Sequence, residues 1–392
     1  MKILVAVTYF GPYVSGLTIY AERIAKAWAR RGHEVTVLTS RHDPSLPREE
    51  FVDGVKIVRC PIWLRISKGA VMPAFWAYAL KHMGEFDVVN IHLPQFDAAW
   101  VAFAARLKKT FSVLTYHCDL VMPSVWVNGL ANRAVLWMNR MAGRFADKVV
   151  AYTEDYAAYS FFLPEFKPKQ AIIQPPVELP AVSDEGVDRF IAAVNPDGFR
   201  PVIGMACRLA EDKGAEILLD ALPAILEKYP NACVYFAGPY DNVLGERPYY
   251  LRLKARFDAM IRADHWRFLG LLSPDGMAKF YRMIDLLTMP SLNRTDSFGL
   301  VQIEAMMNGK PVVASNLPGI RVPVMRHGMG RICEIGSGED LAAKILDVLG
   351  EKRDYRDKTA EIRRTVFIGA SRRSFLIGVP CQVWIMRWPG RL

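Results

Sequence analysis

Short apolar runs alternate with amphipathic segments along most of the chain. Residues 3–8 form an apolar run that predicts a buried strand, and residues 17–31 carry apolar side chains at helical spacing. Gly32 ends that helix. Further runs of strand length follow at residues 34–39, 55–59, 88–92, 112–116 and 148–152. Strands that alternate with helices predict a mostly parallel sheet with helices on both faces.

The alternation restarts in the second half, with predicted strands near residues 202–206, 233–237, 268, 284–289 and 311–315 and a helix near 215–229. The predicted class is therefore α/β, with two Rossmann-like doubly wound domains whose strand-end loops face a central cleft. We assign residues 1–178 to the first domain, 179–200 to a linker, 201–350 to the second domain and 351–392 to a tail.

Net charge and cysteine content limit the partners and the cellular compartment that can be expected for this chain. The formal charge of +10 favours an anionic partner, which could be a nucleotide diphosphate, an acidic lipid surface or a nucleic acid. No nucleic-acid motif is found, so a nucleic-acid partner is not expected. The cysteines lie singly, which argues against a zinc site or a disulfide framework and predicts a reducing compartment. They are Cys60, Cys118, Cys207, Cys233, Cys333 and Cys381.

The ends of the chain affect the predicted location. The first apolar run is too short for a signal peptide, and no run of about 18 apolar residues predicts a membrane span. The expected location is therefore cytoplasmic. The tail from about residue 365 has arginines but no acidic residue, and residues 379–390 show neither a helical nor a strand period. One hypothesis is that it is not native sequence, as after a reading-frame change.

The segment that begins at Asp296 suggests chemistry most directly. It predicts a loop, a helix from about Gly299, a stop at Gly309 and a strand. A helix start leaves backbone N–H groups without partners and carries partial positive charge, which suits a diphosphate. Helical spacing places Glu304 off the core-facing side, available to ligand hydroxyls. Taken alone, the segment fits equally well an ordinary N-cap at Asp296 or Ser297 and a solvated Glu304.

Arg208 and Lys213 form a second signal between a predicted strand and a predicted helix. The planar guanidinium group can grip two phosphate oxygens, and the ammonium group adds a compact positive charge five residues on. In isolation both residues are explained as surface charges. Their place at the same sheet edge as the Glu304 helix favours a shared diphosphate site.

With these segments the chain resembles the retaining glycosyltransferases of family 4, which have the two-domain GT-B architecture. The resemblance covers about residues 1–350 and is most specific in the acid-x7-Glu element with Phe-Gly inside it and in the Arg-x4-Lys-Gly segment. It implies that Arg208 and Lys213 hold the donor diphosphate, that Glu304 binds the ribose and that Asp296 contacts the transferred sugar. The family usually has glutamate where this chain has Asp296. The implied donor-binding set also includes Ser297, Phe298, Gly299 and Leu300.

The first domain adds two matches to the same family. Gly16 closes a Gly-x4-Gly loop after the first strand, and the resemblance implies that its backbone approaches the diphosphate. His117 resembles the family's strand-end histidine beside the donor sugar. Without the resemblance, a tight turn and a structural histidine explain these residues as well. Residues 94–97 and 121–129 are expected to shape the acceptor pocket.

The implied reaction moves a hexose from a UDP- or GDP-linked donor to a glycan or lipid-linked acceptor with retention of configuration. No Asp-x-Asp flanked by apolar strand residues occurs, so we expect neither a metal nor another cofactor. Arg208, Lys213 and the helix start would then stabilise the charge on the leaving phosphate. The catalytic set is predicted to be His117, Asp296, Arg208 and Lys213.

Residues 124–148 predict one long helix with two distinctive faces. The expected core stripe consists of Val127, Leu130, Ala134, Met138, Met141 and Phe145. A second stripe consists of Trp126, Arg133, Trp137, Arg140 and Arg144. Arginine interleaved with tryptophan is typical of a helix on anionic lipid, which would make the protein peripheral on the inner face of the cell membrane. A solvated basic edge with tryptophans packed under a neighbouring domain explains the stripe as well.

Two other functions stay open from the sequence alone. A sugar-nucleotide epimerase would need further acid and base residues around the sugar, and none stands out. A non-catalytic sugar-binding or membrane-docking protein would account for Asp296 and for the irregular tail. Turnover of the donor separates that protein from an enzyme, and the product separates the two enzymes.

Overall fold

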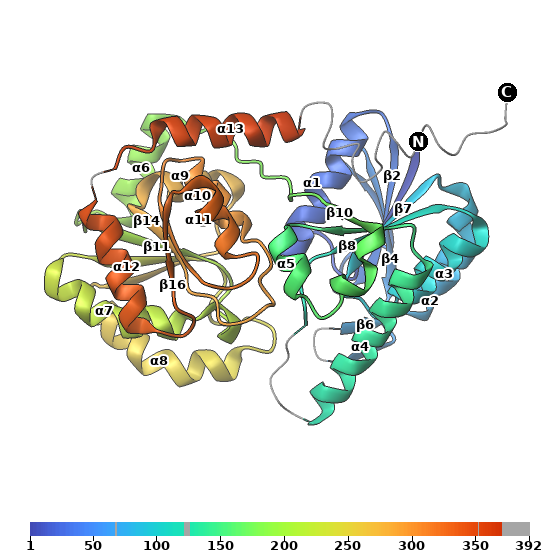
Figure 1. The fold of residues 1–392 in the computed structure, drawn as a ribbon, viewed down its shortest axis with the longest axis horizontal. Coiled ribbons are helices and arrows are strands. Elements are labelled where there is room, and N and C mark those ends of the chain that lie inside the picture. The colour runs from blue at the N-terminus through green and yellow to red at the C-terminus, as the bar shows by residue number, and fades with distance from the viewer. Residues whose placement is uncertain (67–68, 121–125, 352, 371–392) are drawn as a thin grey trace. The chain divides into compact units, whose positions relative to one another are not determined.

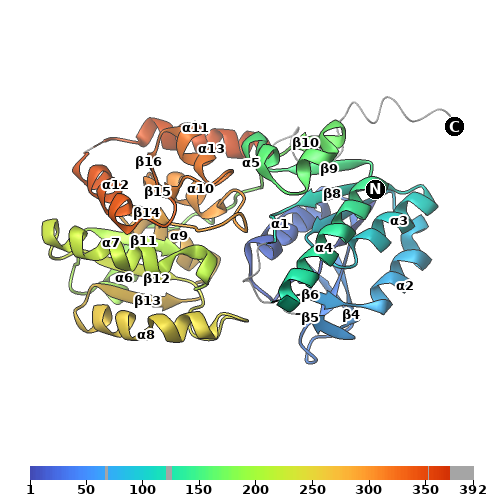
Figure 2. The ribbon, with the colours of Figure 1, turned by 60° about the horizontal axis from the view of Figure 1, so that its bottom comes forward.

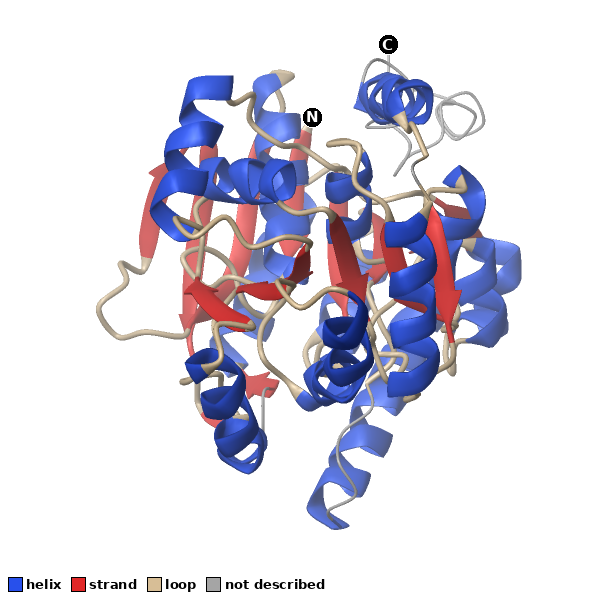
Figure 3. Ribbon diagram, turned by 90° about the vertical axis from the view of Figure 1, so that its left-hand side faces the viewer, coloured by secondary structure: helices blue, strands red, loops and turns tan. Residues whose placement is uncertain are grey.

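The computed structural model describes residues 1–66, 69–120, 126–351 and 353–370, and the chain divides into two compact units (Figure 1). The first unit contains Met1–Pro176 and the second is Val177–Val366. In both units helices cover the strands (Figure 3).

The first unit is built on an eight-stranded sheet in the order β10-β9-β8-β7-β1-β2-β4-β3. All neighbouring strands are parallel except β3 and β4. The central strands are almost entirely buried because helices cover both faces of a parallel sheet. The strands are β1 Lys2–Ala6, β2 Glu34–Arg41, β3 Glu49–Val52, β4 Val55–Pro61, β7 Val88–Leu93, β8 Phe111–Tyr116, β9 Lys148–Ala151 and β10 Gln170–Ile172, with a separate hairpin of β5 Leu64–Ile66 and β6 Gly69–Val71.

The helices of the first unit divide between the two faces of this sheet. Helix α1, Gly16–Arg30, packs Ala21 and Ala25 against one face, and its N-cap residue Ser15 forms a capping box with Thr18. The opposite face is covered mainly by α2, α3 and α4. The remaining bounds are α2 Pro73–His82, η1 Met83–Glu85, α3 Ala98–Lys108, α4 Trp126–Phe145, α5 Glu154–Tyr159 and η2 Leu163–Lys169.

The second unit has a six-stranded, wholly parallel sheet in the order β13-β12-β11-β14-β15-β16 (Figure 2). Helices α7, α8 and α12 pack on one face around Trp266 and Phe257, which are fully buried. The strands are β11 Val202–Ala206, β12 Cys233–Ala237, β13 Trp266–Gly270, β14 Leu286–Met289, β15 Val312–Ser315 and β16 Gly330–Cys333. The helices are α6 Asp184–Val194, η3 Glu211–Lys213, α7 Ala215–Lys228, α8 Arg247–Arg262, α9 Pro274–Met283, α10 Leu300–Met306, α11 Arg321–His327, α12 Gly338–Gly350 and α13 Arg356–Ala370.

Both sheets reverse their strand order once. In the first unit the chain moves outward from β1 through β2 and β4, then returns to the other side of β1 with β7. In the second unit the same reversal falls between β11 and β14. Loops that leave neighbouring strands in opposite directions open a crevice at the carboxyl ends of those strands. The predicted α/β class and the two doubly wound units are confirmed.

The segment predicted as a linker, residues 179–200, contains a helix. Ser183 is the N-cap of α6, and its side chain accepts a hydrogen bond from the backbone of Gly186 at 3.1 Å. Val187 is buried, and α6 packs against α9. Acidic residues in the first turn and a single apolar stripe make this segment a surface helix of the second unit.

The predicted core stripe of α4 is wrong by about a quarter turn. Ala134 is exposed and Met138 is half-buried, whereas Val135, Asn139 and Ala142 are buried. Small side chains at 142, 143 and 146 let α4 lie close to its neighbours, so the larger apolar residues are turned partly outward. The hypothesis about the tail concerns residues from about 365 on, of which 365–370 continue α13 and 371–392 lie outside the described residues.

The burial of α4 gives a direct test by substitution. Replacing Ala142, which is fully buried, with leucine should overpack the contact and cost about 1–3 kcal/mol of unfolding free energy. Replacing the exposed Ala134 with leucine should change stability by less than about 0.5 kcal/mol. Urea unfolding of both variants decides between the two stripes, because equal effects would contradict the observed helix face.

Candidate functional site

The loops that follow β11 and β14 meet at the strand-order reversal of the second unit. Arg208 and Lys213 lie on the first loop, and Asp296 lies on the second. Two glycines allow this arrangement. A Cβ atom on Gly214 would lie 2.1 Å from the carbonyl oxygen of Pro290, and one on Gly238 would lie 1.9 Å from that of Cys207. Both have positive φ angles, so the close approach of the loops depends on glycine.

Arg208 is held by two carboxylates. Its Nη2 atom donates to the Oδ1 atom of Asp212 at 3.0 Å, and its Nη1 atom donates to the Oε1 atom of Glu246 at 3.3 Å. The Arg208 side chain is 28% exposed, so part of the guanidinium group can still be reached. Burial lowers its pKa, but the carboxylates of Asp212 and Glu246 outweigh burial, and the pKa is raised above its ordinary value.

Lys213 connects the two loops. Its Nζ atom bonds the Oδ1 atom of Asp296 and lies 3.0 Å from the Oδ2 atom of Asp212. The other oxygen of Asp296 accepts a hydrogen bond from the Ser291 hydroxyl at 2.5 Å. Burial lowers the pKa of Lys213, but Asp296 and Asp212 more than compensate, so its pKa is raised and the ammonium group stays charged.

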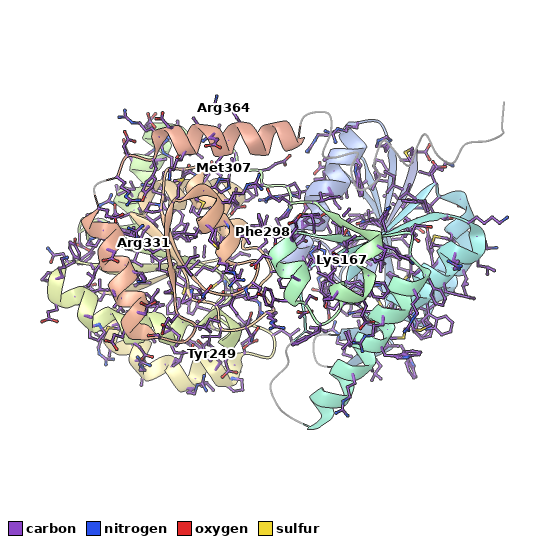
Figure 4. The ribbon with its side chains drawn as sticks, in the orientation of Figure 1. Lys167, Tyr249, Phe298, Met307, Arg331 and Arg364 are labelled. Carbon is purple, nitrogen blue, oxygen red and sulfur yellow. The ribbon has the colours of Figure 1, made fainter. Side chains whose placement is uncertain are left out.

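The turn before α10 is fixed from within the unit. Gly299 is the N-cap, with φ of 75°, and α10 has no side-chain cap. The Gln302 amide donates to the carbonyl oxygens of Phe298 and Ile320 at 3.1 and 2.9 Å. Phe298, labelled in Figure 4, is buried. The ordinary capping explanation for Asp296 is therefore wrong, because its carboxylate is engaged by Lys213 and Ser291.

Glu304 differs from both expectations about its surroundings. Its residue is 6% exposed, so it is not a solvated surface acid. The Tyr281 hydroxyl, from the neighbouring helix α9, donates to its Oε2 atom at 2.8 Å. Arg208, Lys213 and Asp296, which were predicted to share the donor site, thus lie together where β11 and β14 end. Glu304 is more deeply buried than its helical spacing indicates.

In the first unit, Gly16 and Ser15 begin α1 directly after the β1 loop. A Cβ atom on Gly16 would meet no described atom within 4 Å, so packing does not require glycine there. Ser15 caps the helix through its side chain. Packing alone therefore leaves the role of Gly16 open.

His117 lies at the carboxyl end of β8, as predicted, but within a buried network. Its Nε2 atom lies 2.7 Å from the Nδ1 atom of His92, the penultimate residue of β7, and its Nδ1 atom lies 2.5 Å from the Tyr152 hydroxyl. The ring of Tyr20 from α1 packs edge-on against His117, with ring centroids 5.0 Å apart. Burial lowers the pKa of His92 to about 3 and also lowers that of His117, so both rings are neutral at neutral pH.

The chain beyond His117 is anchored through Asp119. Its Oδ1 atom accepts hydrogen bonds from the hydroxyls of Tyr116 at 2.7 Å and Ser160 at 2.8 Å. Its backbone N–H donates to the Tyr156 hydroxyl at 2.5 Å. These contacts fix where β8 ends and therefore hold the His117 ring in place.

Of the two segments expected to shape an acceptor pocket, residues 94–97 are described in full and residues 121–129 only in part. In 94–97, Gln95 and Asp97 are buried, and the Trp76 indole donates to Asp97. Burial raises the pKa of Asp97 to about 7. Of 121–129, residues 121–125 lie outside the described part of the chain. No three His, Cys, Asp or Glu side chains are grouped as metal ligands among the described residues.

Comparison with known proteins fits this arrangement. The family described as "Glycosyl transferases group 1" matches residues 187–365, and that described as "Glycosyl transferase 4-like domain" matches residues 15–173. The chain belongs to the family 4, group 1 glycosyltransferases. The two matches together span most of both units.

Curated relatives support the same assignment over nearly the whole chain. The glycosyltransferase is 26% identical over 356 residues to the phosphatidyl-myo-inositol mannosyltransferase of Mycobacterium tuberculosis, covering 89% of this chain and 86% of that protein. It is 25% identical over 377 residues to the D-inositol 3-phosphate glycosyltransferase of Corynebacterium urealyticum, covering 88% and 85%.

Solved structures share the GT-B fold. The Anabaena protein Alr3699/HepE, in complex with UDP and glucose, matches with a TM-score of 0.70 and 22% identity over 98% of both chains. The sucrose-phosphate synthase of Thermosynechococcus elongatus matches with a TM-score of 0.73 and 18% identity over 93% of this chain and 94% of that one. The predicted GT-B architecture is confirmed.

The structure of the glycosyltransferase shows five partners of the predicted site residues that the sequence prediction missed. They are His92, Tyr152, Asp212, Glu246 and Tyr281. His92 had a readable signal, because one predicted strand ends at His92, His117 directly follows the next, and neighbouring parallel strands bring such ends together. Glu246 and Tyr281 had none, since their contacts join segments 38 and 23 residues apart.

Three of the residues predicted to form the membrane face of α4 are exposed, and one is paired with an acidic residue. Arg133, Trp137 and Arg144 are exposed, and Arg140 bonds Glu165 at 2.5 Å. The side chain of Trp126 lies outside the described set. Among the described helices, none combines the length and apolarity that crossing a bilayer requires.

The buried histidines predict acid sensitivity of the glycosyltransferase. The pKa of His92 is about 3 in the folded chain, against about 6.5 when unfolded. Below about pH 6.5 the unfolded chain therefore binds a proton that the folded chain refuses, and stability falls as pH drops, by up to about 1.4 kcal/mol per pH unit. In His92→Asn, urea unfolding at a series of pH values should show a shallower loss of stability on acidification. An unchanged slope would contradict the neutral buried pair.

Proposed function

We propose that this glycosyltransferase moves a hexose from a UDP- or GDP-linked donor to a glycan or lipid-linked acceptor, with retention of configuration and without a metal ion. The observation that carries the proposal is the Lys213–Asp296 ion pair, which brings the phosphate-binding motif and the sugar-binding acid into contact. Of the two relatives' names, phosphatidyl-myo-inositol mannosyltransferase favours a lipid-linked acceptor, whereas D-inositol 3-phosphate glycosyltransferase refers to an inositol phosphate.

The donor pyrophosphate would occupy the edge where β11 and β14 end. Arg208 and Lys213 are charged there, and each is paired with two carboxylates, of which Asp212 is shared by both. A bound diphosphate would exchange places with some of these carboxylates, because a phosphate carries more charge and accepts a bidentate guanidinium. The amides of Phe298, Gly299 and Leu300 would supplement the two cations.

Stabilisation of the leaving phosphate would be the main catalytic contribution of these groups. Charge grows on the nucleoside diphosphate as the bond to the sugar breaks, and fixed donors aimed at that charge lower the barrier. In this proposal Asp296 orients the transferred sugar through the oxygen that Ser291 also binds, Ser297 lies beside it, and Glu304 holds the ribose. The strand-end His117 is proposed to lie beside the sugar.

The proposal predicts which ligands the protein binds. A nucleotide diphosphate or nucleotide sugar of the correct base should raise the melting temperature, by an amount equivalent to about 2.7 kcal/mol at a hundredfold excess over the dissociation constant. A thermal-shift panel of UDP, GDP, UDP-glucose and GDP-mannose measures this. EDTA should leave the shift and the rate of sugar transfer unchanged, and the anomeric proton coupling of the product reports retention. No shift with any member of the panel would contradict the donor assignment.

Arg208 provides the sharpest substitution. Arg208→Ala should lower donor turnover by about 10²–10³-fold, because one preorganised donor is lost. Its ion pairs are partly buried, but Asp212 keeps Lys213 as a partner, so the free energy of unfolding should fall by only about 1–3 kcal/mol.

The matched control is Arg256→Ala on α8, where the guanidinium group bonds Asp220 at 2.6 Å away from the motif loops. Turnover and unfolding measured on both variants separate catalysis from stability. Equal turnover in wild type and Arg208→Ala would remove Arg208 from the site.

A further inference from the structure

Three helices of the first unit expose large apolar side chains that sugar transfer does not use. On α3, Trp100 is 45% exposed, Phe103 40% and Leu107 59%. On α4, Trp137 is 59% exposed, and on α2 Leu80 is 39% exposed. Single exposed apolar residues are common on protein surfaces, but adjacent ones on neighbouring helices call for an explanation.

Helix packing and two ring contacts bring the elements that carry these side chains side by side. Helix α3 packs against α2 on one side and against α4 on the other (Figures 1 and 2). The rings of Trp76 and Trp100 lie 5.7 Å apart between centroids, and those of Phe103 and Phe145 lie 5.5 Å apart. We call this surface the α2–α3–α4 face. It consists of Trp76, Leu80, Trp100, Phe103, Leu107, Trp137 and Phe145.

Helical spacing keeps the residues on the outer side. Positions 100, 103 and 107 of α3 follow the i, i+3, i+7 pattern, so they share one side of that helix. On α4, position 137 lies opposite the buried side formed by Val135, Asn139 and Ala142. Trp137 is therefore turned outward, away from the buried side of α4.

Charge along the three helices has one sign. Helices α2, α3 and α4, of 10, 11 and 20 residues, contain no aspartate or glutamate. By contrast, α7, α8 and α12 of the second unit each contain acidic residues. The basic residues of the three helices are Lys81, Arg106, Lys108, Arg133, Arg140 and Arg144.

We propose that the α2–α3–α4 face docks on an anionic lipid surface. Tryptophan and phenylalanine rings favour the boundary between head groups and acyl chains, and arginine and lysine reach the phosphates from the rim. The lack of aspartate and glutamate within the three helices favours a uniformly negative lipid surface over a protein partner with mixed charge. The inference goes beyond the proposed transfer, since it states where the enzyme works.

The basic residues and the aromatic rings of the α2–α3–α4 face are expected to contribute separately to lipid binding. Each basic residue near an anionic surface strengthens binding by about fivefold, and the contribution weakens as salt screens it. The rings contribute a part that salt does not remove, because burial of apolar surface is not screened. Binding should therefore need anionic lipid but persist partly at high salt.

Co-sedimentation with vesicles tests the proposal on the full chain. Wild type should bind vesicles of phosphatidylglycerol mixed with phosphatidylcholine, and bind phosphatidylcholine alone at least tenfold more weakly. Trp100→Ser with Leu107→Ser, and separately Arg133→Glu with Arg144→Glu, should each weaken binding to the anionic vesicles by tenfold or more. Matched controls on the second unit are Leu251→Ser with Leu271→Ser, which are 55% and 60% exposed, and Arg189→Glu with Arg256→Glu.

The readouts separate this proposal from the donor chemistry. All variants alter exposed residues outside the donor motifs, so each should keep the thermal shift with the nucleotide ligand, which also verifies folding. Wild type that fails to sediment, or face variants that bind as well as the controls, would overturn the docking surface while leaving the transferase assignment intact. A concentration-dependent dimer that the face variants abolish, without lipid binding, would assign the face to a second copy and also overturn it.

Discussion

The ion pair between Lys213 and Asp296 joins two loops whose residues lie 83 positions apart in the chain. The strands that carry these loops, β11 and β14, become neighbours only because β12 and β13 leave to the other side of the sheet. Without that reversal the two halves of the motif would not meet. Gly214 completes the arrangement, because a side chain there would collide with the backbone of Pro290 and separate the loops. The strand order is therefore a condition for the charge cluster.

The strands were predictable because the central strands of a parallel sheet are buried on both faces and appear as plain apolar runs. The two-unit α/β architecture followed from their alternation with helices. The burial of α4 was not predictable from period alone, since the helix has large apolar residues on one stripe and Ala142, Gly143 and Ala146 on another. Close packing selects the small residues, and that choice depends on the shape of the neighbouring helix α3. The helix within residues 179–200 was missed because its apolar stripe is short.

The motif residues were identifiable, but their partners were not. Arg208 and Lys213 stand at a recognisable spacing, whereas the carboxylate of Glu246 reaches Arg208 from a separate loop. Glu304 was placed correctly on α10, yet its burial depends on Tyr281 from α9. A sequence motif records which groups are present. The contacts that neutralise or bury them come from segments with no fixed spacing.

The two units handle charge in opposite ways. In the second unit the cations and carboxylates are paired but 11–28% exposed, so a charged ligand can compete for them without a bare charge being left in the interior. In the first unit the His92–His117–Tyr152 network is buried and neutral, and its partners already occupy both nitrogens of His117. A neutral, fully buried network is rigid and a poor place for a charge to develop. In the proposed transfer, neutralisation of the leaving phosphate would therefore belong with the second unit, and the first unit would hold uncharged groups in fixed positions.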